Sequence, residues 1–188
     1  MRDGEARFVP LLSAWLRAKR RGQGGTQWHA DEPYSKGNGR WCHRYRALDR
    51  DGHLVAALLS AQRAMAAAPQ FCAQARDMVG HAPAQVPTEG HQASPRAIRE
   101  TLGPGVRQRT GRYNNKRIEQ DHRGIKHRYD PMRGCGSFTS AARCCTGCAE
   151  QRQYFRPQVR SDERVSLAAR RRRFPERYAA VMAALAAA

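Results

Sequence analysis

Residues 114–133 read NNKRIEQDHRGIKHRYDPMR, and the interpretation of the whole chain depends on this basic stretch. In a helix, the spacing i, i+3, i+4, i+7 places four of its side chains on one face: Glu119, His122, Arg123 and Lys126. A carboxylate beside three basic groups suits a divalent metal ion flanked by the phosphates of a nucleic acid. The same pattern also fits an ordinary amphipathic helix whose buried side carries Ile118 and Ile125. The rest of the chain has to separate these two interpretations.

The composition points to a polyanionic partner. The chain has 188 residues, which suits one domain with a terminal extension, and its 34 Lys and Arg against 16 Asp and Glu give a formal net charge of +18. A charge of this size favours nucleic acid first and an anionic membrane surface second. No apolar run approaches the ~20 residues of a membrane span, and the opening MRDGEARF has no apolar signal segment. We therefore expect a cytoplasmic protein that binds nucleic acid and does not enter a membrane.

The cysteines raise the alternative of a zinc site, because Cys145 and Cys148 form a C-x-x-C pair. A structural zinc site normally takes a second pair of ligands at a defined spacing. The sequence holds no second C-x-x-C, and His122 and His127 belong to the helix described above. We expect the cysteines to be small apolar residues of a reducing compartment. A zinc-binding module, which would rest on Cys145 and Cys148 alone, is kept as an alternative function.

Hydrophobic periodicity and turn signals predict an ordered series of strands and helices. Three strands are followed by a helix, a strand, a helix, a strand and the basic helix, over residues 26–34, 40–49, 53–60, 65–79, 85–90, 94–102, 106–110 and 114–133. Asp49 to Gly52 is predicted to be a hairpin turn, with glycine where a positive φ is wanted. Three prolines should begin or interrupt helices: Pro10 in a lead-in helix over 5–21, Pro69 in the 65–79 helix and Pro175 in a helix over 165–188.

This order is that of the ribonuclease H-like α/β fold, a mixed five-stranded sheet flanked by helices, here with a helical lead-in and a helical basic tail. Carboxylates occur on the first strand (Asp31), at the end of the fourth strand (Glu89) and on the final helix (Glu119). A shared metal site explains why acids occur at these three places. Phosphoryl transfer by two metal ions ~3.5–4 Å apart needs such a cluster.

With these residues in place, the chain resembles a bacterial DDE insertion-sequence transposase of the insertion-sequence-six type. The resemblance runs from about residue 1 to about residue 167 and rests on five segments: WHADEPY (28–34), RALDRDGHLV (46–55), TEGHQASPRAIRETLG (88–103), RYNNKRIEQDHRGIKHRYDPMRGCGSF (112–138) and EQRQYFRP (150–157). It implies DNA cleavage at transposon ends and transfer of the cut strand into target DNA, with Mg²⁺ or Mn²⁺.

The resemblance also implies the roles of single residues. The catalytic, metal-holding acids are Asp31, Glu89 and Glu119, in the first, second and third places of the family pattern. The residues that hold DNA are Lys126, which matches the basic residue near the cut, with His122, Arg123 and Arg128. The partners would be transposon-end DNA and target DNA, a homodimer could form on that DNA, and the site of action would be the nucleoid of a prokaryotic cell.

Departures from the family pattern predict weak activity. The family has Asp where this chain has Glu89, and one extra methylene moves a carboxylate further than the roughly 0.5 Å that a metal cluster tolerates. Pro33 removes a backbone donor beside Asp31, and the N-terminal helix-turn-helix of complete members is absent. We expect an N-terminally truncated copy with a lead-in helix and linker (1–25), a DDE core (26–156) and a basic tail (157–188). The alternative is an inactive DNA-binding remnant.

Overall fold

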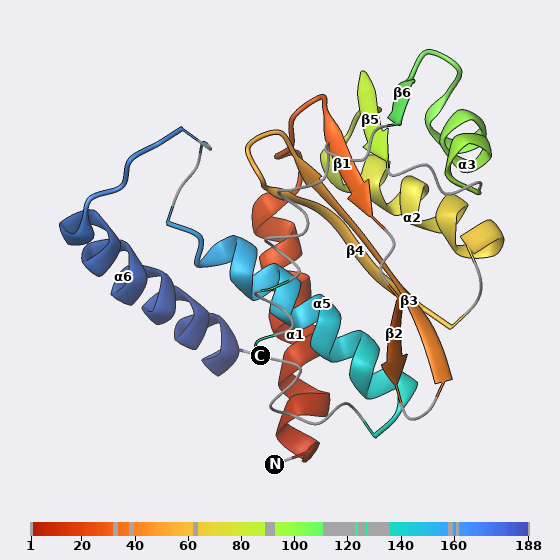
Figure 1. Ribbon diagram of the computed structural model, residues 1–188. Helices are drawn as coiled ribbons and strands as arrows, with labels where there is room; N and C mark the ends of the chain where they lie inside the picture. The colour runs from red at the N-terminus through yellow and green to blue at the C-terminus, as the bar shows by residue number, and fades with distance from the viewer. Residues whose placement is uncertain are drawn as a thin grey trace.

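The computed structural model describes residues 2–31, 34–37, 40–61, 64–88, 93–110, 123, 127, 136–157, 160 and 162–187. The helices and strands are α1 (Arg2–Arg20), β1 (Trp28–Asp31), β2 (Tyr34–Gly37), β3 (Arg40–Asp49), β4 (Leu54–Ser60), α2 (Ala64–Val79), β5 (Gln85–Thr88), α3 (Ala93–Leu102), β6 (Arg107–Thr110), α5 (Phe138–Tyr154) and α6 (Leu167–Ala186). Their order agrees with the prediction except for β2 and α5, which the sequence did not predict, and the predicted helix over 114–133 lies largely outside the described residues. Figure 1 shows α2 and α3 on one face of the sheet and α1 and α5 on the other, with α6 at the side.

The sheet is mixed, as predicted. β1 and β2 both pair antiparallel with β3 in one continuous register, from Trp28 opposite Asp49 to Tyr34 opposite His43, so the two together fill one position. β4 pairs antiparallel with the other side of β3, and β5 pairs parallel with β6. A parallel bridge from Gln27 to Gln85 joins the two groups of strands. The strand positions therefore run β4, β3, β1 with β2, β5, β6.

The predicted hairpin turn between β3 and β4 is confirmed. Gly52 has a φ of 80°, a left-handed value that favours glycine, and its N–H donates to the carbonyl of Asp49 at 2.9 Å. The carboxylate of Asp49 accepts from the backbone N–H of His53 at 2.8 Å and from that of Gly25 at 3.0 Å. One buried side chain thus ties the turn to the linker that leads into β1.

β4 contains a bulge that the sequence did not predict. Ala47 pairs with Ala56 and Leu48 pairs with Leu54, so Val55 is an extra residue on β4. The extra residue changes which side chains face which helix layer. Val55 and Ala56 both belong to the core beneath α2, whereas Leu54 packs against Ala149 of α5. A strand covered on both sides can thereby supply apolar side chains to both layers.

Prolines do not limit the helices as predicted. Pro10 lies inside α1, which begins at Arg2, Pro69 lies inside α2, which begins at Ala64, and Pro175 lies inside α6. A proline removes one backbone hydrogen bond from a helix. Around Pro69 that cost is offset by packing, because Ala68 and Phe71 are buried in the core on either side of it. Pro10 and Pro175 are exposed, so water can bond the carbonyls that they leave without a donor.

Candidate metal and nucleic-acid site

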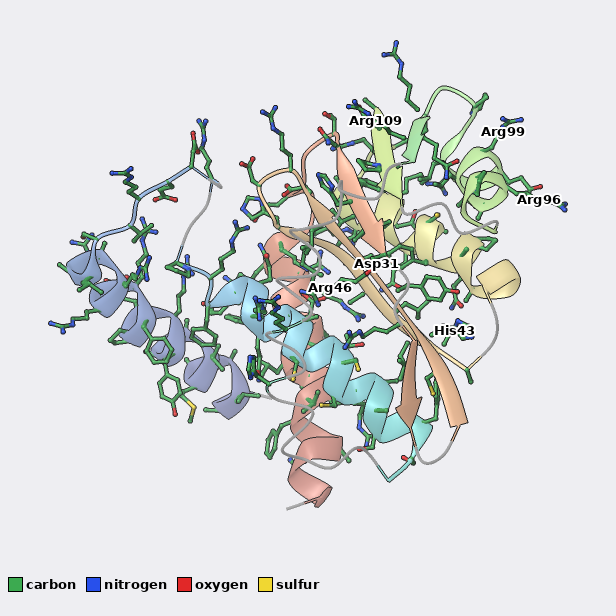
Figure 2. The ribbon with its side chains drawn as sticks, in the orientation of Figure 1. Asp31, His43, Arg46, Arg96, Arg99 and Arg109 are labelled. Carbon is green, nitrogen blue, oxygen red and sulfur yellow. The ribbon has the colours of Figure 1, made fainter. Side chains whose placement is uncertain are left out.

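Asp31 is the last residue of β1 and lies opposite Arg46 of β3. Directly opposite residues of antiparallel strands project to the same face of the sheet. Arg46 alternates with Leu48, which packs on α5, so Asp31 also belongs to the α5 side. Asp31 is half-buried. Figure 2 shows it at the tip of β1 with Arg46 beside it. A carboxylate is thus held at the C-terminal end of a strand in the middle of the sheet.

The structure describes only part of the predicted site. Asp31 and Arg123 are described, and Arg123 is exposed. The other predicted site residues lie outside the described residues: Glu89, Glu119, His122, Lys126 and Arg128. β5, the strand beside β1, is described as far as Thr88, the residue before Glu89.

Two buried arginines near Asp31 were missed by the sequence analysis. Arg44 is 8% exposed and Arg46 is 2% exposed, and both point to the face of β3 that α5 covers. The Nε atom of Arg44 is buried and has no hydrogen-bond partner within the described part of the chain. A signal was present, because Arg44 and Arg46 alternate between Cys42 and Leu48 on a strand with apolar residues on its other face. Two guanidinium groups are thus buried on the same face of the sheet as the Asp31 carboxylate.

A second group of arginines is exposed on α3 and β6. Arg107 and Arg109 project from the same side of β6, and Arg96 and Arg99 lie on α3, which leads into that strand. Figure 2 shows Arg96, Arg99 and Arg109 together at one edge of the molecule. Arg96 donates to Glu100 at 2.7 Å, and both side chains of this pair are exposed. The remaining arginines give this edge a positive charge that suits phosphate groups.

Asp49 has a different task from Asp31. Burial by itself raises the pKa of Asp49, but hydrogen bonds from the His53 ring and from the backbone N–H groups of His53 and Gly25 outweigh it and lower that pKa below 3.8. The His53 Nδ1 lies 3.1 Å from the Asp49 carboxylate. A carboxylate so fully bonded within its own turn holds structure and is not available as a metal ligand.

The cysteine pair lies on α5. Cys145 and Cys148 are one helical turn apart there, and both are partly buried free thiols. Among the described residues, no group of three or more His, Cys, Asp or Glu side chains is arranged to hold a metal ion. Also within the described residues, no helix is both long enough and apolar enough to cross a membrane.

A model of the DDE domain of IS240-type transposases matches residues 25–158 of this chain. The chain belongs to the DDE insertion-sequence transposase family. The Staphylococcus aureus transposase for the insertion sequence-like element IS431mec is 33% identical over 127 residues, which are 64% of this chain and 55% of that relative. The S. aureus transposase for insertion sequence element IS257 in transposon Tn4003 matches to the same extent. This DDE-family chain therefore spans about half the length of the curated relatives.

Solved structures share the fold of this DDE-family chain. The catalytic core domain of HTLV-2 integrase, solved in complex with magnesium, gives a TM-score of 0.52 at 12% identity, covering 81% of this chain and 98% of that one. A chain of the simian T-cell lymphotropic virus intasome in complex with PP2A regulatory subunit B56 gamma gives 0.52 at 15% identity, covering 74% of this chain and 52% of that one. The predicted RNase H-like, retroviral-integrase-like fold is confirmed.

Proposed function

We propose that this chain is the catalytic core of a DDE transposase, which cuts DNA at transposon ends and joins the cut strand to target DNA. The observation that supports this most strongly is the position of Asp31. It ends β1 in the middle of a mixed sheet, beside the parallel strand β5, in a chain of the DDE family. Open sheets of this kind place functional groups beyond the carboxyl ends of their strands.

The strand register supports a role for Glu89 beside Asp31. β1 and β5 run parallel from the bridge between Gln27 and Gln85. Gln27 and Gln85 are 58 residues apart, and the same 58 residues separate Asp31 from Glu89 in the sequence. We assign Asp31, Glu89 and Glu119 as the catalytic acids that hold the metal ions.

The donor chemistry fits Mg²⁺ or Mn²⁺, which take carboxylate oxygens as ligands, and half-buried Asp31 offers such oxygens at the end of β1. When bound, a pair of such ions would activate water and stabilise the charge of the reacting phosphate. The basic residues of the 114–133 stretch would hold the DNA backbone in place: His122, Arg123, Lys126 and Arg128. The exposed position of Arg123 is compatible with this task.

We further propose that the core comprises residues 26–156, between a lead-in segment (1–25) and a basic tail (157–188), and that it acts at the bacterial nucleoid. Its partners would be transposon-end and target DNA, with a homodimer on that DNA. Activity would be weak because Glu89 stands where the family has Asp, which displaces a metal-binding carboxylate.

The test is metal-dependent cleavage of a labelled duplex that carries a transposon end. Asp31→Asn should lower cleavage in Mn²⁺ at least about 100-fold, since it removes a ligand charge. Glu119→Ala should abolish cleavage, and Glu89→Asp should raise it if carboxylate placement is the defect. The matched control is Asp77→Asn, which changes an exposed carboxylate on α2 and should leave cleavage unchanged. DNA binding without any cleavage, in the parent chain and in Glu89→Asp alike, would favour the inactive DNA-binding remnant.

A further inference from the structure

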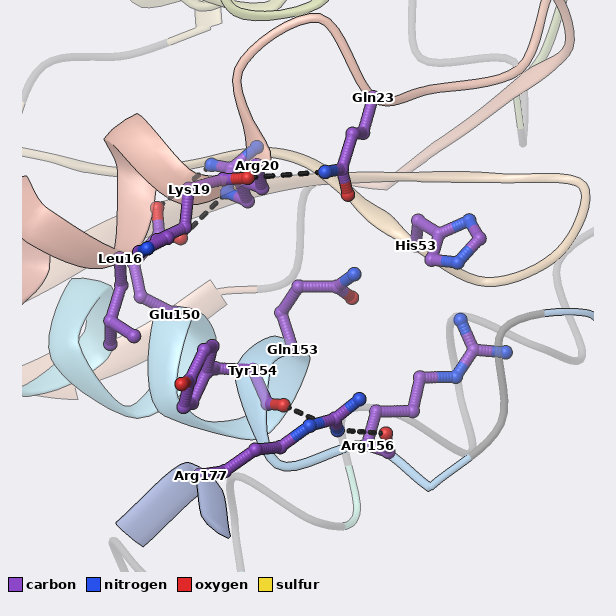
Figure 3. Close-up of a pocket in the computed structure, with 10 residues that line it drawn as sticks. All are labelled: Leu16, Lys19, Arg20, Gln23, His53, Glu150, Gln153, Tyr154, Arg156 and Arg177. Atoms are coloured by element: carbon purple, nitrogen blue, oxygen red, sulfur yellow. Dashed lines mark hydrogen bonds and ion pairs between the residues drawn. The ribbon is translucent and has the colours of Figure 1, made fainter. Parts of the chain in front are cut away.

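A cavity of about 270 Å³ lies away from Asp31, where four segments meet: the end of α1, the hairpin turn before β4, the end of α5 and the middle of α6. Figure 3 shows its lining, and the polar side chains used below are Lys19, His53, Glu150, Gln153, Arg156 and Arg177. Its volume equals that of roughly nine waters at ~30 Å³ each, which is enough for a phosphate group. The cavity lies near the turn that follows Asp49, the last residue of β3, whereas Asp31 pairs with Arg46, three residues before the end of that strand.

Among the described residues that line this cavity, Glu150 carries the single carboxylate, and its charge is neutralised. Glu150 accepts from Arg20 Nε at 2.6 Å and Nη2 at 2.8 Å, and from Arg17 Nε at 3.1 Å. Two arginines bound to one carboxylate leave no net negative charge there. The remaining charged side chains of the lining are Lys19, Arg156 and Arg177, all cationic. The cavity as a whole is therefore positively charged.

Two side chains of the lining, Gln153 and Arg177, are fixed by hydrogen bonds and still have N–H groups that can bond a ligand. Gln153 accepts from the backbone N–H of Leu54 through Oε1 at 3.0 Å, which fixes the side chain and leaves its amide NH₂ to donate. Arg177 donates to the carbonyls of Tyr154 and Arg156 through Nη1, at 2.7 and 2.6 Å. Within the described residues, the other nitrogens of the Arg177 guanidinium have no hydrogen-bond acceptor. The central carbon of this guanidinium, Cζ, lies 5.8 Å from the centroid of the Tyr154 ring.

The hairpin turn closes one side of the cavity. His53 lines it, and the Nδ1 atom of this ring lies 3.1 Å from the Asp49 carboxylate. Arg156 donates to the carbonyl of Asp51, and its guanidinium lies so close to Gly52 that a Cβ there would stand 3.3 Å from Nη2. The turn and the end of α5 are therefore fastened together around the cavity before any ligand arrives.

We propose that this cavity binds a phosphate group, supplied by a nucleic-acid backbone, at a place separate from the predicted metal site. Phosphate has three or four acceptor oxygens, and it suits a small cavity with cations and fixed N–H donors on several sides. The choice of nucleic acid as the source rests on the proposed function. The binding of phosphate itself rests only on the cavity.

The decisive variant is Gln153→Glu. It is nearly isosteric and keeps an acceptor for the Leu54 N–H, but it replaces the amide donor with a negative charge. Lys19→Gln removes one cation from the lining. Lys19 is exposed, and its ammonium nitrogen lies 5.2 Å from the centroid of the Trp15 ring, so the substitution breaks no hydrogen bond of that side chain within the described part of the chain. The matched control is Arg21→Gln, an exposed arginine two residues further along that does not line this cavity.

The first measurement is calorimetric titration of the full chain with inorganic phosphate, without divalent metal. We expect binding that weakens about fivefold in Lys19→Gln, is lost in Gln153→Glu and is unchanged in Arg21→Gln. Thermal denaturation without phosphate checks that Gln153→Glu is folded, and Lys19→Gln provides the answer if it is not. No phosphate binding by the parent chain, or equal binding by all four proteins, would overturn the proposal.

The second measurement tests the source of the phosphate by titrating a short DNA duplex, again without metal, so that cleavage plays no part. Weaker duplex binding by Gln153→Glu than by Arg21→Gln supports a backbone phosphate in the cavity. Loss of inorganic phosphate binding with unchanged duplex binding would overturn nucleic acid as the source. If Asp31→Asn does not lower DNA cleavage, the proposed catalytic function is contradicted, but the results of these two binding measurements are unaffected.

Discussion

Glu150→Gln should destabilise this protein far more than its single lost charge suggests. Glu150 and Arg20 form a buried ion pair between α5 and α1, with side chains 1% and 6% exposed. The same Arg20 donates through Nη1 to the carbonyls of Leu54 and Val55 at 2.8 and 3.1 Å, which are the residues of the β4 bulge. Glu150 thus holds the guanidinium that bonds two backbone carbonyls freed by the bulge.

The expected magnitude follows from this geometry. Removing one partner of a buried ion pair typically costs about 3–5 kcal/mol, because the other charge is left buried without compensation. Glutamine keeps one acceptor oxygen, so we expect the lower end, about 3 kcal/mol. For a chain of this length that corresponds to a fall in Tm of roughly 6–12 °C. It is a large share of a total stability that is typically about 5–15 kcal/mol.

The assay is urea denaturation followed by circular dichroism, read as a change in midpoint at constant slope. The control is Glu100→Gln, which breaks an exposed pair of similar length, Arg96 to Glu100 at 2.7 Å, and should change the free energy of unfolding by no more than about 0.5 kcal/mol. Equal effects of the two variants would refute the reasoning about burial.

A double variant separates the ion pair from the bulge. Replacing a buried pair with apolar residues is often neutral. Arg20→Met with Glu150→Leu, however, also removes the donor to the carbonyls of Leu54 and Val55, and each unsatisfied buried group costs about 1–3 kcal/mol. We expect the double variant to stay at least about 2 kcal/mol below the parent. Full recovery would show that Arg20 does nothing for the bulge.

Three further outcomes follow from the packing and from the pKa shifts. Gly147→Ala should lower the free energy of unfolding by about 1 kcal/mol net, because its Cβ would lie 2.8 Å from Val9 Cγ1. Gly105→Ala, which has open space around it, should not destabilise the protein, and equal Tm values for the two variants would contradict this. Burial raises the pKa of Cys72 to about 11, so iodoacetamide at pH ~8 should label the thiols of α5 before that of Cys72. Labelling of Cys72 at the same rate as the α5 thiols would contradict this. Because the pKa of Asp49 is lowered in the folded state, its carboxylate stabilises the fold above about pH 4, and this stability is lost as the pH falls through that pKa. Asp49→Asn should therefore reduce the loss of unfolding free energy at low pH. An unchanged loss at low pH would show that Asp49 is not its cause.

The fold was predictable where local chemistry decides the structure. The turn from Asp49 to Gly52 and the order of elements from β3 to β6 follow from short-range signals, and both are confirmed, whereas α5 was not predicted. The bulge at Val55 was not predictable, because residues 54–59, LVAALL, are all apolar and give no alternation from which to assign faces. The prolines were misjudged because a local penalty of a few kcal/mol can be offset, by packing around Pro69 and by water at the exposed Pro10 and Pro175.

The candidate site divides in the same way. The place of Asp31 near the end of the first strand was predictable and is confirmed, whereas its role as a metal ligand stays a prediction. The pair of Arg20 and Glu150 was not predictable, since 130 residues separate the partners and no local pattern links them. Arg44 and Arg46 could have been found, because alternate charges on a central strand require burial of charge.

The unpredicted contacts bear on the predicted site through β3. Asp31 owes its position to its pairing with Arg46, and the place of β3 in the sheet depends on β4, which pairs with its other side. The register between β3 and β4 shifts at the bulge, where Arg20 bonds the Leu54 and Val55 carbonyls. A cluster of metal-binding carboxylates tolerates displacements of only roughly 0.5 Å. The ion pair between α1 and α5 is therefore linked to the position of Asp31 through β4 and β3, as well as to stability.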